Sequence, residues 1–421
     1  MSKIKSVTAR EILDSRGSPT VETKIILDSG ATATASVPSG VSVGKYEAVE
    51  LRDQDPHRFH GRGVLRAIAS VNQTIAEQIV GREFASQLQL DETLIKLDGT
   101  KEKAKLGANA ILSVSEAFCK AMALQANIPC FAYVAHLYGL GPNDLKMPTP
   151  MSVQIEGGKH GAGNLDFQEF LVIPSSGQTF AEALRMLAEI YWETEKVLIQ
   201  YQAVHSVGDE GGYAPNLFTN LDALEVLAEA IQALKYNLGR QVFLGLDVAP
   251  AYFYHQNKYR IKDRTTPMTT EELVEFYRDL LRQYPLASIE DPFHEDDWGG
   301  WTKLAQFTGN TIIVGDDLLT TNKQRVQQAL RKGACSAILI KPNQVGTVAE
   351  TIEVIKLARQ AGWKVIVSHR GGETNEDFIA DFAVGVGADY VKFGAPARGE
   401  RVAKYNRLLA IEKMIDQNAH E

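Results

Sequence analysis

Six short apolar runs decide the fold: FLGLD (243–247), LASIE (286–290), TIIVGD (311–316), AILIK (337–341), VIVSH (365–369) and YVK (390–392). Each run ends on a charged or ionisable residue. After a first interval of 43 residues, the runs end at steps of 26, 25, 28 and 23 residues. One strand plus one helix fills such a step, which is typical of a parallel β/α barrel. The residues that end the runs are therefore expected to meet at one rim of the barrel, where the active sites of this fold lie.

The opening of the barrel is less regular. Residues 151–155 and 170–174 read as strands that are joined by a loop too short to hold a crossover helix, so the second strand must be antiparallel to the first. The loop side chain of His160, together with Gln168 and Glu169, is then placed on the same rim. Two helical segments follow with no strand between them, and their connection VGDEGGYAPN (207–216) returns Glu210 to this rim as well.

The chain before the barrel has a different pattern. Three apolar runs, at residues 3–13, 21–27 and 31–37, are separated by turn sequences and predict an antiparallel meander. Helical periodicity follows, and the segment GLGPNDLKMPTP (139–150) reads as a boundary. The sequence thus predicts an α/β protein in two parts. An N-terminal α+β cap (1–138), made of a three-stranded meander plus helices, precedes a modified TIM-type barrel (139–421) whose second strand is antiparallel.

Three acids end successive barrel strands: Asp247, Glu290 and Asp316. Each acid alone could be a helix cap or a solvated loop residue. Three together, with no cysteine or histidine cluster beside them, form an oxygen donor set suited to a hard divalent cation such as Mg²⁺. Without a cation these carboxylates would repel one another in a site of low dielectric constant.

Two lysines and a further acid suggest the chemistry. Lys341 is expected to lie beside the cation and Lys392, which would depress its pKa and make it a general base; a salt bridge to one of the acids is the alternative. A base next to a metal can remove a proton α to a carboxylate, because the cation stabilises the enediolate that forms. Glu210 near Glu169 could hold a proton at neutral pH and protonate a leaving hydroxyl, although an exposed turn explains Glu210 equally well. His369 and Arg370 form a cationic pair suited to phosphate or carboxylate.

Composition excludes several classes of protein. The chain has 421 residues, with 44 Lys and Arg against 52 Asp and Glu, a formal net charge of −8. This acidic balance argues against nucleic-acid and anionic-membrane partners, which require a basic face. No apolar run is long enough to cross a bilayer, and the beginning of the chain lacks the apolar region of a secretory signal. Three cysteines without metal-ligand spacing fit a reducing compartment, so the expected location is cytoplasmic.

The sequence resembles the enolase (phosphopyruvate hydratase) family nearly from end to end. The stretches that carry the resemblance are AREILDSRGSPTVE, a PSG-x-S-x-G loop, LDGTKEKAKLGANAILSVS, DFQEF, VGDEGGYAPN, SIEDPF, VGDDL, IKPNQVGT, SHRGGET and ARGERVAKYN. The resemblance implies a Mg²⁺-dependent hydro-lyase that interconverts 2-phosphoglycerate and phosphoenolpyruvate in glycolysis and gluconeogenesis. It also implies two Mg²⁺ ions per site and a homodimer, or a larger ring of dimers.

By matching position, the resemblance also implies roles for single residues. Lys341 would accept the proton and Glu210 would donate one, with Glu169 assisting and with His369 and Lys392 among the catalytic groups. Asp247, Glu290 and Asp316 would bind the first Mg²⁺, and Ser42 would help to bind the second. The residues expected to contact substrate are His160, Gln168, Glu169, Lys341, His369, Arg370, Gly371 and Lys392, with Lys392 facing the substrate carboxylate.

Several neighbours of these residues depart from the family pattern. Val43 replaces a hydroxyl residue in the SGAST-G loop, Gly371 replaces the serine that binds phosphate, and Phe393 replaces the threonine of a lysine-threonine-glycine motif. NIINGG-x-H reads VQIEGGKH here, which introduces Glu156 and Lys159, and a usual serine-glutamate pair is Ala251-Tyr252. Losing one hydrogen bond to a charged group costs about 1.5–3 kcal/mol, roughly ten- to a hundredfold in affinity. The departures leave open a weaker enolase, a paralogue acting on a related phospho- or phosphono-2-hydroxy acid, and a non-catalytic protein that reuses the fold.

Overall fold

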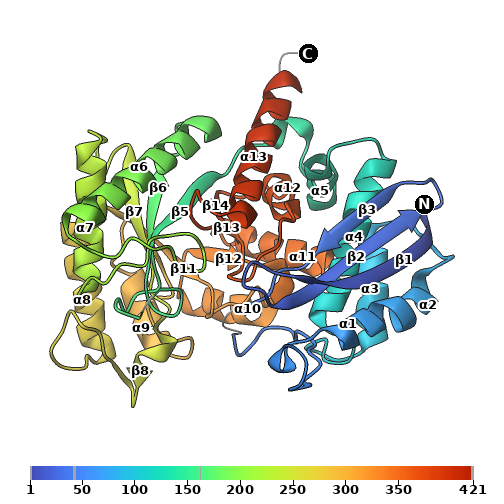
Figure 1. The fold of residues 1–421 in the computed structure, drawn as a ribbon, viewed down its shortest axis with the longest axis horizontal. Coiled ribbons are helices and arrows are strands. Elements are labelled where there is room, and N and C mark those ends of the chain that lie inside the picture. The colour runs from blue at the N-terminus through green and yellow to red at the C-terminus, as the bar shows by residue number, and fades with distance from the viewer. Residues whose placement is uncertain (1, 41–43, 162, 419–421) are drawn as a thin grey trace.

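The computed structural model describes residues 2–40, 44–161 and 163–418. Its N-terminal part is an antiparallel sheet with strand order β3-β2-β1-β4. The strands are β1 (Ser2–Leu13), β2 (Pro19–Leu27), β3 (Thr32–Ser36) and β4 (Glu83–Phe84). The predicted meander is therefore present, and the two-residue strand β4 adds a fourth member that the sequence pattern did not indicate. This sheet forms one end of the molecule (Figure 1).

Helices cover one face of this sheet. Strand β2 alternates buried and more exposed residues along much of its length, and its buried face packs against α4 (Ala108–Gln125), which is buried over most of its surface. The helical periodicity that follows the meander begins with α1 (Leu65–Ala69), the π-helical turn η2 (Ser70–Ile75) and α2 (Ala76–Ile79). Helices α3 (Gln87–Asp98) and α5 (Cys130–Tyr138) complete this part. Ser86 caps the start of α3, and Gly99 ends it in the left-handed conformation.

Eight strands close the barrel in the order β10-β11-β12-β13-β14-β5-β6-β7. Strand β6 pairs antiparallel with both of its neighbours, and every other pair in the barrel is parallel. The antiparallel second strand is thus confirmed. Its cause is the loop between β5 and β6, which contains no helix. The barrel strands are β5 (Thr149–Glu156), β6 (Glu169–Pro174), β7 (Val242–Asp247), β10 (Leu286–Glu290), β11 (Ile312–Gly315), β12 (Ala337–Ile340), β13 (Lys364–Ser368) and β14 (Tyr390–Lys392).

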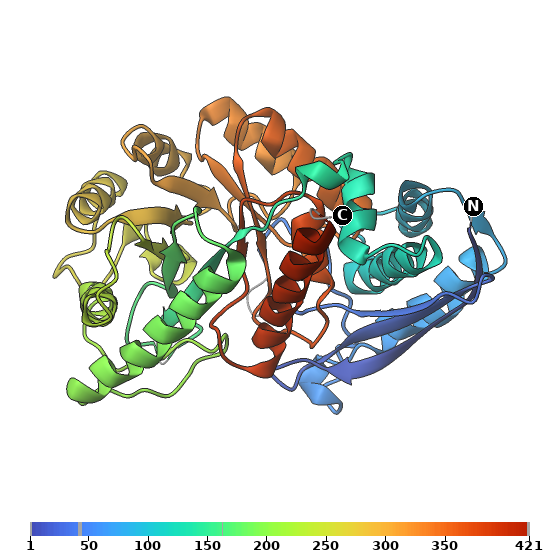
Figure 2. The same ribbon diagram turned by 90° about the horizontal axis from the view of Figure 1, so that it is seen from above.

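Amphipathic helices surround the barrel. Side-chain caps such as Thr219 with Asp222, and Thr269 with Glu272, fix where α7 and α8 begin. The helices are α6 (Phe180–Gln200), α7 (Asn220–Ala233), α8 (Thr270–Gln283), α9 (Trp298–Ala305), α10 (Lys323–Lys332), α11 (Val348–Gln360), α12 (Phe378–Gly385) and α13 (Gly399–Asn418). Seen from above, α13 crosses the middle of the molecule, between the barrel and the N-terminal part (Figure 2). The two parts also touch where α5 packs on α12 and Phe131 donates its backbone N–H to Asp381, at 3.0 Å.

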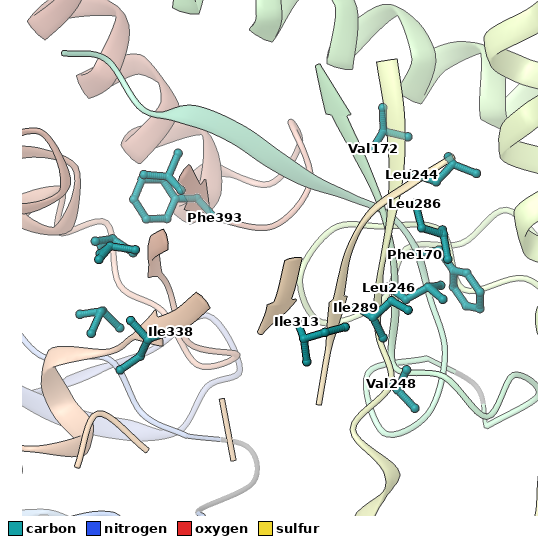
Figure 3. Packing of buried hydrophobic residues seen from close by; sticks show 14 of the residues in the cluster. Phe170, Val172, Leu244, Leu246, Val248, Leu286, Ile289, Ile313, Ile338 and Phe393 are labelled. Carbon is teal, nitrogen blue, oxygen red and sulfur yellow. The ribbon is translucent and has the colours of Figure 1, made fainter. Parts of the chain in front are cut away.

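Branched aliphatic and aromatic side chains fill the space between the barrel and its helices. Figure 3 shows Phe170, Leu244, Leu246 and Ile289 clustered along β6, β7 and β10. Ile338 on β12 belongs to the same core and is fully buried. Such close packing makes the barrel a rigid support for the residues at its rim. Among the described residues, no helix combines the length and the apolar character needed to cross a membrane.

Replacing Ile338 with alanine should lower the free energy of unfolding by about 2–5 kcal/mol, because the lost side chain leaves a cavity that a packed barrel cannot fill. Chemical denaturation followed by circular dichroism measures this change. Leu88→Ala is the matched control, since the Leu88 side chain is 56% exposed on α3 and its loss should change stability by only about 0.5 kcal/mol. Equal effects of the two substitutions would contradict this description of the core.

Candidate active site

A row of four acids crosses the rim of the barrel. The Cα partners in the strand register are Glu156 with Glu169, Glu169 with Asp247, and Asp247 with Glu290. These residues end β5, begin β6, end β7 and end β10. Four adjacent strands therefore each place a carboxylate at the same edge of the barrel. All four are buried, with exposed fractions of 3% or less. The predicted placement of Glu169 beside the later strand ends is what the structure shows.

Lys392 places one ammonium group against three of these acids. Its Nζ lies 2.9 Å from Glu169 Oε2, 2.9 Å from Asp247 Oδ2 and 2.8 Å from Glu290 Oε2. Burial opposes the charge of Lys392, but attraction to Asp247, Glu169 and Glu290 outweighs it and raises its pKa well above the ordinary value. Lys392 is therefore a fixed positive charge at the centre of the site.

Lys341 is paired with the remaining predicted metal acid. It follows β12, and its Nζ donates to Asp316 Oδ2 at 2.5 Å. Burial lowers the pKa of Lys341, but attraction to Asp316 raises it, and the net direction is upward. The expectation of a depressed pKa for Lys341 is therefore wrong for this state, because the salt bridge that was the alternative forms. Gln344 supports the pair by donating to Asp316 Oδ1 at 3.3 Å.

The donor set at this rim fits a divalent cation. Oε1 of Glu290 is buried and has no hydrogen-bond partner among the residues that the structure describes. Burial and the charge of Asp247 raise the pKa of Glu290 well above its ordinary value, so the ionised carboxylate lacks compensation that a cation would supply. Asp247 and Asp316 lie close enough to Glu290 to add to this repulsion. Asp291 and Asp317 bring further oxygens next to Asp316, within 4.8 Å of one another, a group that sequence reasoning did not single out.

A second cluster faces the first across the cavity and is built around Glu210. Glu210 Oε2 lies 2.9 Å from His369 Nε2, and Glu210 Oε1 lies 3.6 Å from His160 Nδ1. The same His160 atom is 3.2 Å from Glu169 Oε1. The loop holding Glu210 thus returns to the rim as the sequence predicted.

The pKa of Glu210 is shifted in the direction opposite to the predicted one. Burial raises it, but His369, His160 and Arg401 together hold the pKa of Glu210 well below its ordinary value. The proton resides on a histidine instead. Although burial lowers the pKa of His160, the charges of Glu210 and Glu169 raise it to about 9. Histidines from distant parts of the chain cause this reversal, and local sequence does not reveal their approach.

Arg401 fixes His369 and is a functional residue that sequence reasoning missed. Its guanidinium NH1 donates to His369 Nδ1 at 2.8 Å. Arginine can only donate, so Nδ1 is the acceptor and the proton of neutral His369 sits on Nε2, facing Glu210. Arg401 also donates to the carbonyls of Arg370 and Gly371, each at 2.6 Å. The ARGERVAKYN stretch was the available signal, but nothing in its spacing to the strands indicated this role.

Arg370 is held by a second residue that the sequence analysis did not identify, Glu47. Arg370 NH1 donates to Glu47 Oε2 at 3.0 Å and to Asn343 Oδ1 at 3.0 Å. Gly371, next to it, offers no side chain, while its carbonyl accepts from Ser15 Oγ at 3.4 Å as well as from Arg401. The predicted metal ligand Ser42 and the substituted Val43 lie outside the described residues.

Two further departures from the family pattern, Phe393 and Tyr252, lie apart from the reacting groups. Phe393 is fully buried and packs edge-on against Tyr405, with ring centroids 6.1 Å apart, so its ring belongs to the core. Tyr252 lies over Gly158, and its buried hydroxyl has no hydrogen-bond partner in the part of the chain that the structure describes. Phe393 and Tyr252 do not line the cavity between the two clusters.

That cavity collects most of the predicted residues. It is lined by the predicted residues His160, Gln168, Glu169, Glu210, Asp247, Asp316, Lys341, His369, Arg370, Gly371 and Lys392, together with Glu47, Ala249, Asp291, Asp317 and Ser368. Glu290 lies beneath it, in contact with Lys392.

A barrel whose rim joins clustered carboxylates, two lysines and a histidine–carboxylate pair defines a class of enzymes that remove a proton next to a carboxylate with help from a metal. Comparison with known proteins narrows this class. Residues 4–134 match the family model of the enolase N-terminal domain, and residues 144–420 match that of the enolase C-terminal TIM barrel domain. An enolase from Ehrlichia canis (strain Jake) is 45% identical over 417 residues, which are 99% of this chain and 97% of that protein.

The chain belongs to the enolase family. It is a hydro-lyase that dehydrates 2-phosphoglycerate to phosphoenolpyruvate. The resemblance drawn from the sequence motifs is confirmed.

The raised pKa of His160 predicts a pH-dependent contribution to stability. A histidine whose pKa rises from about 6.5 to about 9 on folding stabilises the protein fully below pH 6.5, and this contribution is lost as the pH rises through 9. In the absence of metal, the original protein should therefore have a higher free energy of unfolding than His160→Gln. This margin should be larger at pH 6 than at pH 9.5, by roughly 1–3 kcal/mol. Urea denaturation at the two pH values measures it. A margin that is constant or grows with pH would contradict the ion pairs assigned to His160.

Proposed function

We propose that the cavity between the two clusters is the site at which 2-phosphoglycerate is dehydrated. Asp247, Glu290 and Asp316 would hold a Mg²⁺ ion there, and Ser42 would help to hold a second. When bound, the cation draws electron density from the substrate carboxylate and makes the proton on C2 more acidic. The observation that carries this proposal is the way in which the buried acids are paired with lysines. Three carboxylates on neighbouring strand ends are shared between two lysines, and within the described part of the chain one oxygen of Glu290 has no partner.

Lys341 is the base in this proposal and takes the proton from C2. Burial lowers its pKa, and so do the charges of Arg370 and Lys392, whereas Asp316 is the largest influence in the other direction. Any ligand that draws the Asp316 carboxylate away from Lys341 therefore lowers the pKa of this amine, so that more of it is neutral and able to accept a proton.

Glu210 is the acid and gives a proton to the departing C3 hydroxyl, which leaves as water. Its carboxylate is ionised in the free protein, so the proton must be supplied by its neighbours. His160 carries one at neutral pH, and neutral His369 presents Nε2–H to Glu210 at 2.9 Å. Glu169 assists by holding His160 in place, 3.2 Å from its Nδ1. The proton balance closes, because Lys341 gains one proton and the Glu210 cluster loses one.

The remaining cavity residues bind and orient the substrate. Lys392, fixed in a positively charged state, faces the substrate carboxylate. Arg370 would bind phosphate, for which its guanidinium must exchange Glu47 for the ligand. Gln168, His160, His369 and the backbone at Gly371 complete the contacts. The hydroxyl absent at Gly371 leaves Arg370 and backbone amides as the phosphate ligands at this point.

Assembly and location extend the same proposal. We expect a homodimer or a larger ring of dimers acting in the cytoplasm on a phosphorylated acid, without nucleic-acid or membrane partners. The boundary between the two domains is proposed at residues 138 and 139, within the segment that links α5 to β5.

Removal of metal tests the cation site. Purified protein should convert 2-phosphoglycerate to phosphoenolpyruvate with Mg²⁺, followed as absorbance at 240 nm. Excess EDTA should abolish this turnover, because the buried acids then keep Lys341 charged, and added Mg²⁺ should restore it. Activity that persists in EDTA would refute the proposed site.

Substitution of the base separates chemistry from metal binding. Lys341→Ala should reduce kcat at least about a hundredfold, the effect of losing a general base, while Mg²⁺ affinity measured by titration calorimetry stays close to that of the original protein. Lys103→Ala is the matched control, since Lys103 is also a buried lysine in an ion pair, 3.0 Å from Glu350, but lies outside the cavity. An unchanged rate in Lys341→Ala would exclude it as the base.

A further inference from the structure

Glu156 is a buried acid behind Glu210. It is the last residue of β5, its side chain is 1% exposed, and it stands where the family pattern has asparagine. It does not line the cavity, so it does not reach substrate.

The carboxylate of Glu156 organises the loop that carries Glu210. It accepts the backbone N–H of Glu210, 3.0 Å from Oε1 and 3.2 Å from Oε2, and the N–H of Gly212, 2.6 Å from Oε1. The loop closes tightly on it, because a Cβ at Gly208 would lie 2.3 Å from Glu156 Oε2. The backbone of the same residue holds the far side of the loop, where Glu156 N–H donates to the Tyr213 carbonyl at 2.7 Å.

The charged groups around Glu156 explain its protonation state. Glu210, Glu169 and His160 face it, and the Tyr191 phenol lies nearby. Burial first, and then the charge of Glu210, raise the pKa of Glu156 to about 8, with His160 acting in the opposite direction. Near neutral pH its carboxyl therefore carries a proton, and the glutamine amide is a neutral group of similar size that keeps an oxygen acceptor.

We infer that Glu156 is a positioning residue for the proton donor, holding the Glu210–Gly212 backbone so that the Glu210 carboxylate stays between His369 and the substrate hydroxyl. This inference rests on the proposed function of Glu210. The geometry makes it selective for one half of the reaction. Lys341 follows β12 and works from the opposite cluster, and none of the contacts of Glu156 involve it.

The two halves of the reaction can be measured separately. The Nζ amine of Lys341 takes the C2 proton from the substrate. In D₂O this proton exchanges with solvent, so that deuterium returns to C2. The exchange needs no departure of the C3 hydroxyl. Dehydration needs Glu210 in place, so a displaced Glu210 blocks the second half alone.

The experiment compares Glu156→Ala, Glu156→Gln and the original protein, all with Mg²⁺. In Glu156→Ala, kcat should fall about 10- to 100-fold, the effect of misplacing a catalytic group by about 1 Å, while KM changes by no more than about twofold. Exchange of the C2 proton, followed by NMR in D₂O, should remain within about threefold of the original rate, since such a shift would leave Lys341 in place. Glu156→Gln should recover most of the lost kcat, because it restores an acceptor for the two N–H groups.

Glu412 provides the matched control. Its carboxylate also accepts two consecutive backbone N–H groups, those of Phe180 at 2.5 Å and Ala181 at 3.0 Å, but at the start of α6 and outside the cavity. Glu412→Ala should change stability without separating kcat from exchange. If Glu156→Ala does not fold, Glu156→Asp replaces it, since the shorter side chain keeps a carboxyl group but no longer reaches both amides.

The outcomes are distinct. If the original protein neither dehydrates 2-phosphoglycerate nor exchanges its C2 proton, the proposed function fails. If the original protein is active and the Glu156 variants keep their kcat, or lose turnover and exchange in equal measure, the positioning role of Glu156 is overturned.

Discussion

The site depends on one buried ammonium group and the three carboxylates around it. Lys392 lies within 2.9 Å of oxygens from Glu169, Asp247 and Glu290. Three like charges at this depth would repel one another strongly if they stood alone, and a charge removed from water needs such pairing to persist. Lys392 therefore makes the acidic rim compatible with a folded barrel. Glu290 remains available to a divalent cation, since one of its oxygens has no partner in the described residues 2–40, 44–161 and 163–418.

Strand register explains why these groups meet. Glu156, Glu169, Asp247 and Glu290 are successive partners across β5, β6, β7 and β10. A shift of one residue in any of these pairings would turn a carboxylate to the other face of the sheet. The antiparallel strand β6 is part of this arrangement, because its first residue, not its last, lies at the active rim. The apolar core under the rim keeps the register in place, so packing and catalysis constrain the same strands.

The sequence predicts the fold and the residues of the site better than it predicts which of those residues are protonated. The step from one apolar run to the next indicates the barrel, and the short loop after residue 155 indicates its antiparallel strand. Residues at strand ends follow directly. The pKa directions of Lys341 and Glu210 were wrong, because they depend on which partner each side chain reaches: Asp316 for Lys341, and two histidines for Glu210. Arg401 and Glu47 were missed for a related reason, since both reach the site from elements outside the barrel strands.

The departures from the family pattern lie in different parts of the structure. Phe393 faces the core, where a larger apolar side chain gains packing against Tyr405. Gly371 lies in the cavity wall, yet its backbone is held by Arg401 and Ser15, so a hydroxyl is absent while the loop keeps its position. Glu156 lies behind the proton donor and bonds to its backbone. Of the departures that fall within the described residues, only Gly371 lines the cavity that substrate would enter. Substrate contacts can thus vary independently of the acid–base groups, because the latter are anchored from behind by residues that never meet the ligand.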